Sequence, residues 1–103
     1  MEKHYLIKVK YAKGEEIRFV SHLDSMRAIE RTIRRANLPM EYSQGFNPRM
    51  KISYLTQAIK VGEISDSCEA VFTLTEEVAP EDFKARFNAE APMGIRVLEA
   101  TLQ

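Results

Sequence analysis

Apolar and polar residues alternate along parts of this chain with a period of two, which is typical of β-strands. The alternation is clear over residues 4–11 and 68–75, and residues 51–61 and 95–102 are also extended in character. In the first stretch, one set of side chains should face a core and consists of Tyr5, Ile7, Val9 and Tyr11. We therefore expect four strands, with residues 12–16 and 62–67 as turns.

Two other stretches have the spacing of three and four residues that indicates an amphipathic helix. The first covers residues 21–37, because Ser21 can cap the first turn and a proline follows the end. The second covers residues 80–91, because a proline opens it and Phe83 and Phe87 lie one turn apart. The expected apolar stripe of the first helix is Leu23, Met26, Ile29, Ile33 and Ala36.

The order of elements is strand, helix, long connection, strand, strand, helix, strand. This order predicts an α+β fold, the ferredoxin-like split βαβ sandwich, with a four-stranded antiparallel sheet and two helices on one face. Right-handed crossovers place both helices on the same side. The length of 103 residues suits one domain, 1–103.

The sheet face away from the helices should be open. We expect it to be more apolar than a free solvent face usually is, so that a partner, a second copy or a further segment could cover it. The residues assigned to this open face are His4, Leu6, Lys8, Lys10, Val71, Leu98 and Leu102.

The net charge is zero, but the charges are unevenly distributed. Residues 1–60 contain 12 Lys and Arg against 6 Asp and Glu, whereas residues 61–103 contain 3 against 9. This asymmetry indicates either a basic binding face or two halves that neutralise each other in the fold.

The sequence lacks the residues that several classes of function require. The single cysteine, Cys68, excludes an internal disulfide and an iron–sulfur cluster, and it fits a reducing, cytoplasmic setting. The sequence has no HExxH zinc motif and no Gly-rich phosphate loop, so we expect no metal and no cofactor. No apolar run is long enough to span a membrane.

Arginine is concentrated on one side of the first helix and in the connection after it. Arginine makes planar, paired contacts to phosphate, so these residues could bind a nucleic-acid backbone; alternatively, they form an ordinary solvated helix face. The predicted phosphate-binding residues are Arg27, Arg31, Arg34, Arg35, Arg49 and Lys51. The connection could also recognise a base, because Phe46 either stacks on it or packs under the loop. The predicted recognition residues are Ser43, Gln44, Phe46 and Asn47.

His22 is the titratable residue of most interest, at the first turn of the first helix. It is either a partly buried histidine beside the cap or a general acid/base or phosphate contact. We predict that the long connection folds back over this end of the helix and brings Asn47 near His22.

Two segments carry a family resemblance: SHLDSMRAIERTIRRANLP and, after it, YSQGFNPRMKIS. With them the chain resembles the bacterial radical-SAM-linked domain family of unknown function. Its members are typically fused to, or encoded beside, a cobalamin-type radical SAM protein, often near ribonuclease E/G genes. The resemblance implies a bacterial cytosolic protein in an RNA-related context and supplies no established activity. The chain departs from the family at Met50, where proline is usual. It is also shorter than the usual family domain, so the resemblance implies that residues 1–103 could be the N-terminal part of a longer family domain.

Three hypotheses follow. The first is an accessory domain, not itself an enzyme, that binds RNA for or together with a radical SAM enzyme. The second is a protein-interaction module that docks such an enzyme through the open sheet face and binds no nucleic acid. The third is a metal-free RNA-processing enzyme that uses His22. The sequence leaves the oligomeric state open.

Overall fold

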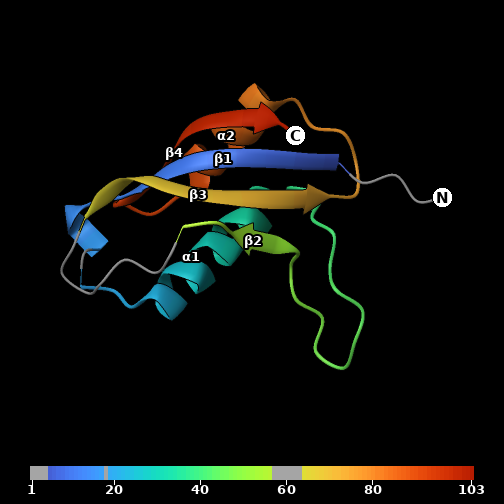
Figure 1. Cartoon of the computed structure of the whole chain (residues 1–103), viewed down its shortest axis with the longest axis horizontal. Helices are drawn as coiled ribbons and strands as arrows, with labels where there is room; N and C mark the ends of the chain where they lie inside the picture. The colour runs from blue at the N-terminus through green and yellow to red at the C-terminus, as the bar shows by residue number, and fades with distance from the viewer. Residues whose placement is uncertain (1–4, 18, 57–63) are drawn as a thin grey trace.

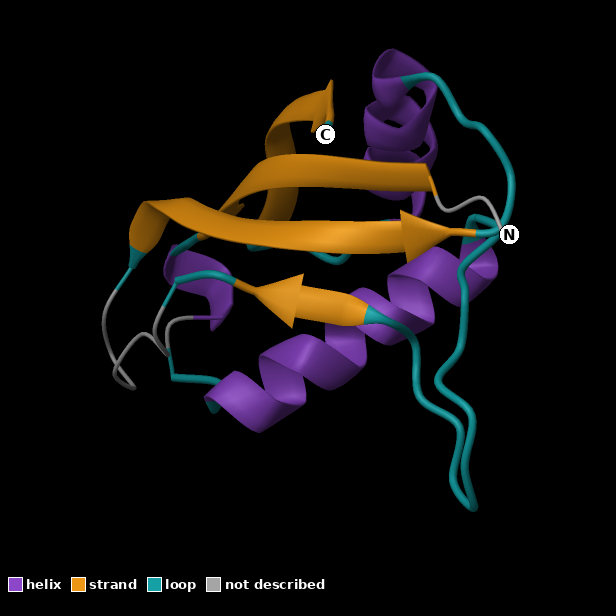
Figure 2. Cartoon of the chain, turned by 45° about the vertical axis from the view of Figure 1, so that its right-hand side comes forward, coloured by secondary structure: helices purple, strands orange, loops and turns teal. Residues whose placement is uncertain are grey.

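Four strands form one antiparallel sheet in the order β2-β3-β1-β4, and two helices lie on one side of it (Figures 1 and 2). The structure is a computed structural model that describes residues 5–17, 19–56 and 64–103. Its elements are β1 (Tyr5–Lys13), the 3₁₀ turn η1 (Glu15–Ile17), α1 (His22–Arg35), β2 (Ile52–Tyr54), β3 (Ser65–Leu74), α2 (Pro80–Glu90) and β4 (Ile95–Leu102). The ferredoxin-like arrangement expected from the sequence is confirmed.

The core fills the space between the sheet and the two helices. Phe72 of β3 meets Phe83 of α2 with ring centroids 5.1 Å apart, and Phe83 and Phe87 stack at 6.2 Å. Helix α1 contributes Ile29 and Ile33 to this core, and both side chains are at most 2% exposed. These large side chains, together with the inward residues of the strands, fix both helices against one face of the sheet.

Helix α1 begins as predicted. Ser21 is its N-cap, and the backbone N–H of Asp24 donates to the Ser21 hydroxyl at 3.1 Å. The helix ends where Asn37 takes a positive φ of 54°, a conformation that asparagine tolerates. The expected apolar stripe was partly wrong, because Leu23 is 49% exposed. Leu23 lies about 200° around the helix from Ser25, which faces the core.

The connection from α1 to β2 is a hairpin that extends away from the body of the protein. We call residues 41–51 the hairpin 41–51; it is the green loop in Figure 1. Its arms are paired by Lys51 N–H to Glu41 O and Ser43 N–H to Arg49 O, each at 2.8 Å. Met50 is buried in the core and opposes Tyr42, so it anchors one arm of the hairpin.

Several predicted boundaries shift. β1 runs on to Lys13, which was assigned to a turn, and β3 starts at Ser65, within the expected turn 62–67. β2 covers only three residues of the extended stretch 51–61. Residues 57–63 and His4 lie outside the described residues.

The open sheet face is more polar than expected, because β4 contains a bulge. Val97 opposes Tyr11 and Glu99 opposes Lys10, so Leu98 is an extra residue and the alternation changes face at this point. As a result, Leu102 opposes Ile7 and shares the helix side of the sheet. A broad hollow on this face is lined mainly by charged and hydroxyl side chains: Lys8, Lys10, Ser67, Glu69, Glu99 and Thr101. Leu6 and Val71, which oppose Thr73 and Lys8, remain on the open face as expected.

Candidate functional site

A groove lies between α1 and the hairpin 41–51, and arginine dominates its walls. Its volume is about 340 Å³, and its lining residues are Arg27, Glu30, Arg31, Arg34 and Arg49. We call it the arginine groove. Four of the six residues predicted to bind phosphate therefore meet in one place, although Arg49 is far from the other three in sequence.

An ion pair joins the two walls of the groove. Arg49 Nη2 lies 2.7 Å from Glu30 Oε2, and the Glu30 side chain is only 9% exposed. The hydrogen bond that Arg49 donates to the Glu30 carboxylate, together with the negative charge of that carboxylate, raises the pKa of Arg49 above its usual value. Glu30 thus holds the base of the hairpin against the middle of α1 and sets the direction of the Arg49 guanidinium.

The other predicted cations are exposed. Arg27 makes a long contact of 3.6 Å with Asp24, in which both side chains are more than 60% exposed, so solvent screens it. Arg31 and Arg34 are exposed on the same side of α1. The two remaining residues lie outside the groove lining: Arg35 is exposed at the end of α1, and Lys51 pairs with Glu41 at 3.3 Å.

The tip of the hairpin presents the predicted recognition residues to solvent. Phe46 is fully exposed, so the packed alternative for this ring was wrong. Gln44 and Asn47 are exposed beside it. Ser43 has a structural contact as well, since its hydroxyl accepts from the Arg49 backbone N–H at 3.1 Å.

His22 lies apart from the hairpin tip. Its ring meets Tyr54 of β2 edge-on, with centroids 5.8 Å apart. The expected approach of Asn47 to His22 was wrong, because the ion pair attaches the hairpin at Glu30, eight residues or about 12 Å further along α1. His22 therefore belongs to the partly buried class of histidines rather than to a site shared with Asn47.

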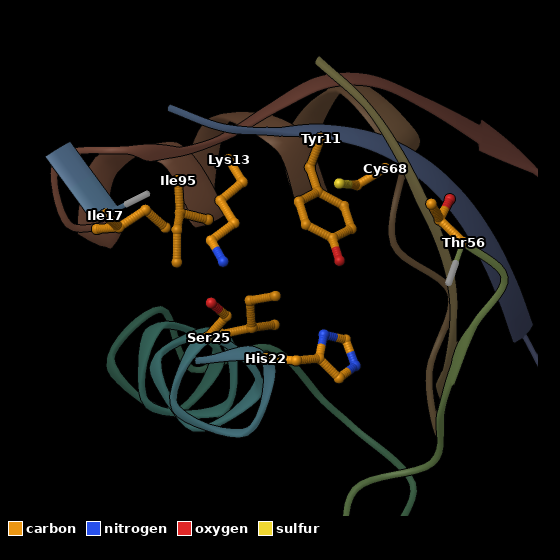
Figure 3. Close-up of a pocket in the computed structure, with 9 residues that line it drawn as sticks. Tyr11, Lys13, Ile17, His22, Ser25, Thr56, Cys68 and Ile95 are labelled. Atoms are coloured by element: carbon orange, nitrogen blue, oxygen red, sulfur yellow. The ribbon is translucent and has the colours of Figure 1, made fainter. Parts of the chain in front are cut away.

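His22 also lines a small cavity between α1 and the sheet (Figure 3). Lys13 and Tyr11 point into it from β1, and Ser25 and His22 point into it from α1. The complete lining is Tyr11, Lys13, Ile17, His22, Ser25, Ile29, Thr56, Cys68 and Ile95. Burial raises the pKa of Tyr11, with a further rise from Cys68, and burial also raises the pKa of the Cys68 thiol.

Comparison with known proteins identifies the family. Residues 7–102 match the model of a family described as "Uncharacterized protein conserved in bacteria (DUF2344)". The chain belongs to the DUF2344 family. No curated protein and no solved structure matches it.

Within its described residues, this DUF2344 chain has no cluster of three or more His, Cys, Asp and Glu side chains arranged to hold a metal ion. None of the helices in the same residues is long and apolar enough to cross a membrane.

Sequence reasoning missed Glu30 and Lys13. The spacing of Glu30 and Arg34, four residues apart on one helix, predicts only a surface pair, whereas Glu30 is buried and holds Arg49. Lys13 had a recognisable signal in the DUF2344 sequence: it continues the odd-numbered inward set of β1 after Tyr11.

Proposed function

We propose that this protein binds RNA at the arginine groove and the hairpin tip, as an accessory to a radical SAM enzyme. The observation that carries the proposal is the convergence of Arg27, Arg31, Arg34 and Arg49 in one groove, with Glu30 the single carboxylate among the lining residues. Because the ion pair holds Arg49 in place, less side-chain entropy is lost when phosphates bind.

The geometry suits a single strand or a loop better than a regular duplex. A groove of arginines can follow a phosphate backbone, and Phe46 at the tip of the hairpin offers a free aromatic face on which an unpaired base can stack. Gln44 and Asn47 beside Phe46 can donate to and accept from a base edge. Phosphate contacts would supply most of the affinity, and the hairpin tip would supply selectivity.

The link to a radical SAM enzyme rests on the family resemblance of the SHLD and SQGFNP segments. The chain has one cysteine, so an iron–sulfur cluster would belong to the partner. In this proposal the groove holds the RNA while the partner performs the chemistry. The partner's affinity for the RNA should then rise when this chain is added, and an unchanged affinity would remove this part of the proposal.

Docking through the open sheet face has less support. That hypothesis rested on an apolar face, and the bulge at Leu98 removes Leu102 from it. Lys8 and Glu69 form a 3.1 Å ion pair on the same face, which is ordinary for a solvated surface.

The test is fluorescence anisotropy with a labelled, single-stranded RNA over a series of salt concentrations. With three or four phosphates neutralised, affinity should fall about 30-fold between about 50 and 200 mM salt. Arg31→Glu should weaken binding about tenfold or more and flatten the salt slope by about one. Phe46→Ala should weaken binding by a similar factor while leaving the salt slope unchanged, because stacking releases no counterions.

Arg96→Glu is the matched control. It makes the same charge change at an exposed position on β4, at the opposite edge of the sheet from β2. Affinity in this variant should stay close to that of the wild type. If Arg31→Glu and Arg96→Glu weaken binding equally, or if no RNA binds at low salt, the groove is not an RNA site.

A further inference from the structure

The cavity between β1 and the first turns of α1 contains a buried ammonium group. Lys13 is 5% exposed, and its Nζ donates to the Val20 carbonyl at 2.8 Å. An ammonium has three N–H donors, so two remain for other acceptors. Among the described residues, no carboxylate lies within 4.0 Å of Lys13 to pair with it, although a buried charge normally requires a partner.

A second polar group on the opposite wall also lacks a partner. Ser25 is 8% exposed, and its buried hydroxyl makes no hydrogen bond within the described part of the chain. Figure 3 shows this hydroxyl directed from α1 toward the side of the cavity from which Lys13 extends. A buried hydroxyl without a hydrogen bond is costly, so a water molecule or an ion that bonded to the Ser25 hydroxyl would stabilise the folded protein.

The remaining lining carries no negative charge. Tyr11, His22 and Thr56 contribute polar side chains, and no Asp or Glu is among the lining residues. Burial raises the pKa of Tyr11 and of Cys68, so both are neutral near pH 7 and neither compensates Lys13. Ser25 and His22 also lie in the first turns of α1, where the helix dipole favours an anion.

The size of the cavity limits what it can hold. Its volume of about 20 Å³ has room for one or two water molecules. A phosphate ester or a nucleotide is too large. We propose that the cavity is a binding site for one small monovalent anion, a halide or a single carboxylate group, held between the Lys13 ammonium and the Ser25 hydroxyl.

The proposal is tested by thermal unfolding of the whole protein in increasing sodium formate and, separately, sodium bromide. An anion that binds only the folded state raises Tm with concentration. Lys13→Met, which keeps the length of the side chain and removes its charge, should abolish this rise for both salts. Ser25→Ala should keep the fold and shift the response to about tenfold higher concentration. Lys10→Met, the same change on the open sheet face, should respond like the wild type.

The two salts distinguish the two sources of the anion. A stronger response to formate identifies a carboxylate site, and a stronger response to bromide identifies a halide site. Crystals soaked in bromide should show anomalous density within hydrogen-bonding distance of Lys13 Nζ. Equal responses of wild type and Lys13→Met to both salts, or a cavity that contains only water in the soaked crystals, would overturn the proposal.

Discussion

Gly94 has the least space for a side chain among the described glycines. Its replacement therefore tests how tightly Ile17 packs against the Gly94 backbone. Its φ is +96°, in the region that residues with a side chain rarely adopt. A Cβ built on Gly94 would lie 2.9 Å from both γ carbons of Ile17. Ile17 lines the small cavity, and the Gly94 carbonyl accepts from Gly14 N–H at 2.7 Å. Gly94→Ala should therefore disturb this end of the protein.

Two costs and one gain determine the size of the effect. The unfavourable φ costs about 1–2 kcal/mol, and the contact with Ile17 adds about 1–3 kcal/mol because a branched side chain in a packed site must move. Alanine also restricts the unfolded chain more than glycine does, which raises the free energy of unfolding by about 0.5 kcal/mol. We expect a net loss of about 3 kcal/mol, which corresponds to a fall in Tm of about 12–24 °C for a domain of this size.

Urea unfolding followed by circular dichroism measures the loss and separates its parts. Ile17→Ala removes the γ carbons, so Gly94→Ala in that background should cost only the backbone part, about 1–2 kcal/mol. Gly14→Ala is the control, because its added Cβ would meet the flexible Glu16 side chain at 3.2 Å and its φ is not in the disfavoured region. The predicted strain at Gly94 is ruled out if Gly94→Ala lowers the free energy of unfolding no more than Gly14→Ala does. The predicted contact with Ile17 is ruled out if the cost of Gly94→Ala is the same with and without the Ile17 side chain.

Two further predictions concern the ion pair of the groove and the partly buried Tyr54. Arg49→Met removes the partner of Glu30, so hydrogen exchange at the Ser43 and Lys51 amides of the hairpin should become several-fold faster; unchanged rates would show that the backbone pairing alone holds the hairpin. Burial raises the pKa of Tyr54, so the unfolded chain ionises first and stability is lost as pH rises above about 10. In urea unfolding at successive pH values Tyr54→Phe should show a smaller alkaline loss, and an equal loss in both proteins would contradict this assignment.

Local signals predicted most of the fold. Ser21 and Pro80 fixed the starts of the two helices, since a cap and a first-turn proline act through their own backbone neighbours. β4 was found over its full length, residues 95–102, because its composition is strand-like whichever side each residue faces.

The direction in which side chains point was harder to predict. The bulge at Leu98 arises from pairing with β1, and nothing in residues 95–102 taken alone marks an extra residue. The burial of Glu30 was hard to predict for the same reason. It occurs among arginines on a helix, so its local pattern indicates a surface pair, whereas a residue 19 positions away in sequence covers it. Such contacts are set by tertiary structure.

Helix α1 carries the two proposed sites on different sides. Ser25 and His22 face the cavity, whereas Arg31 and Arg34 face the arginine groove. About 120° separates Ser25 from Arg31 around the helix, and their positions differ by six residues or about 9 Å along its axis. Sites at this separation with no shared partner usually act additively. Lys13→Met should therefore leave RNA affinity unchanged, and Arg31→Glu should leave the response to formate unchanged. Each variant is thus a control for the other proposal, and failure of one site says nothing against the other.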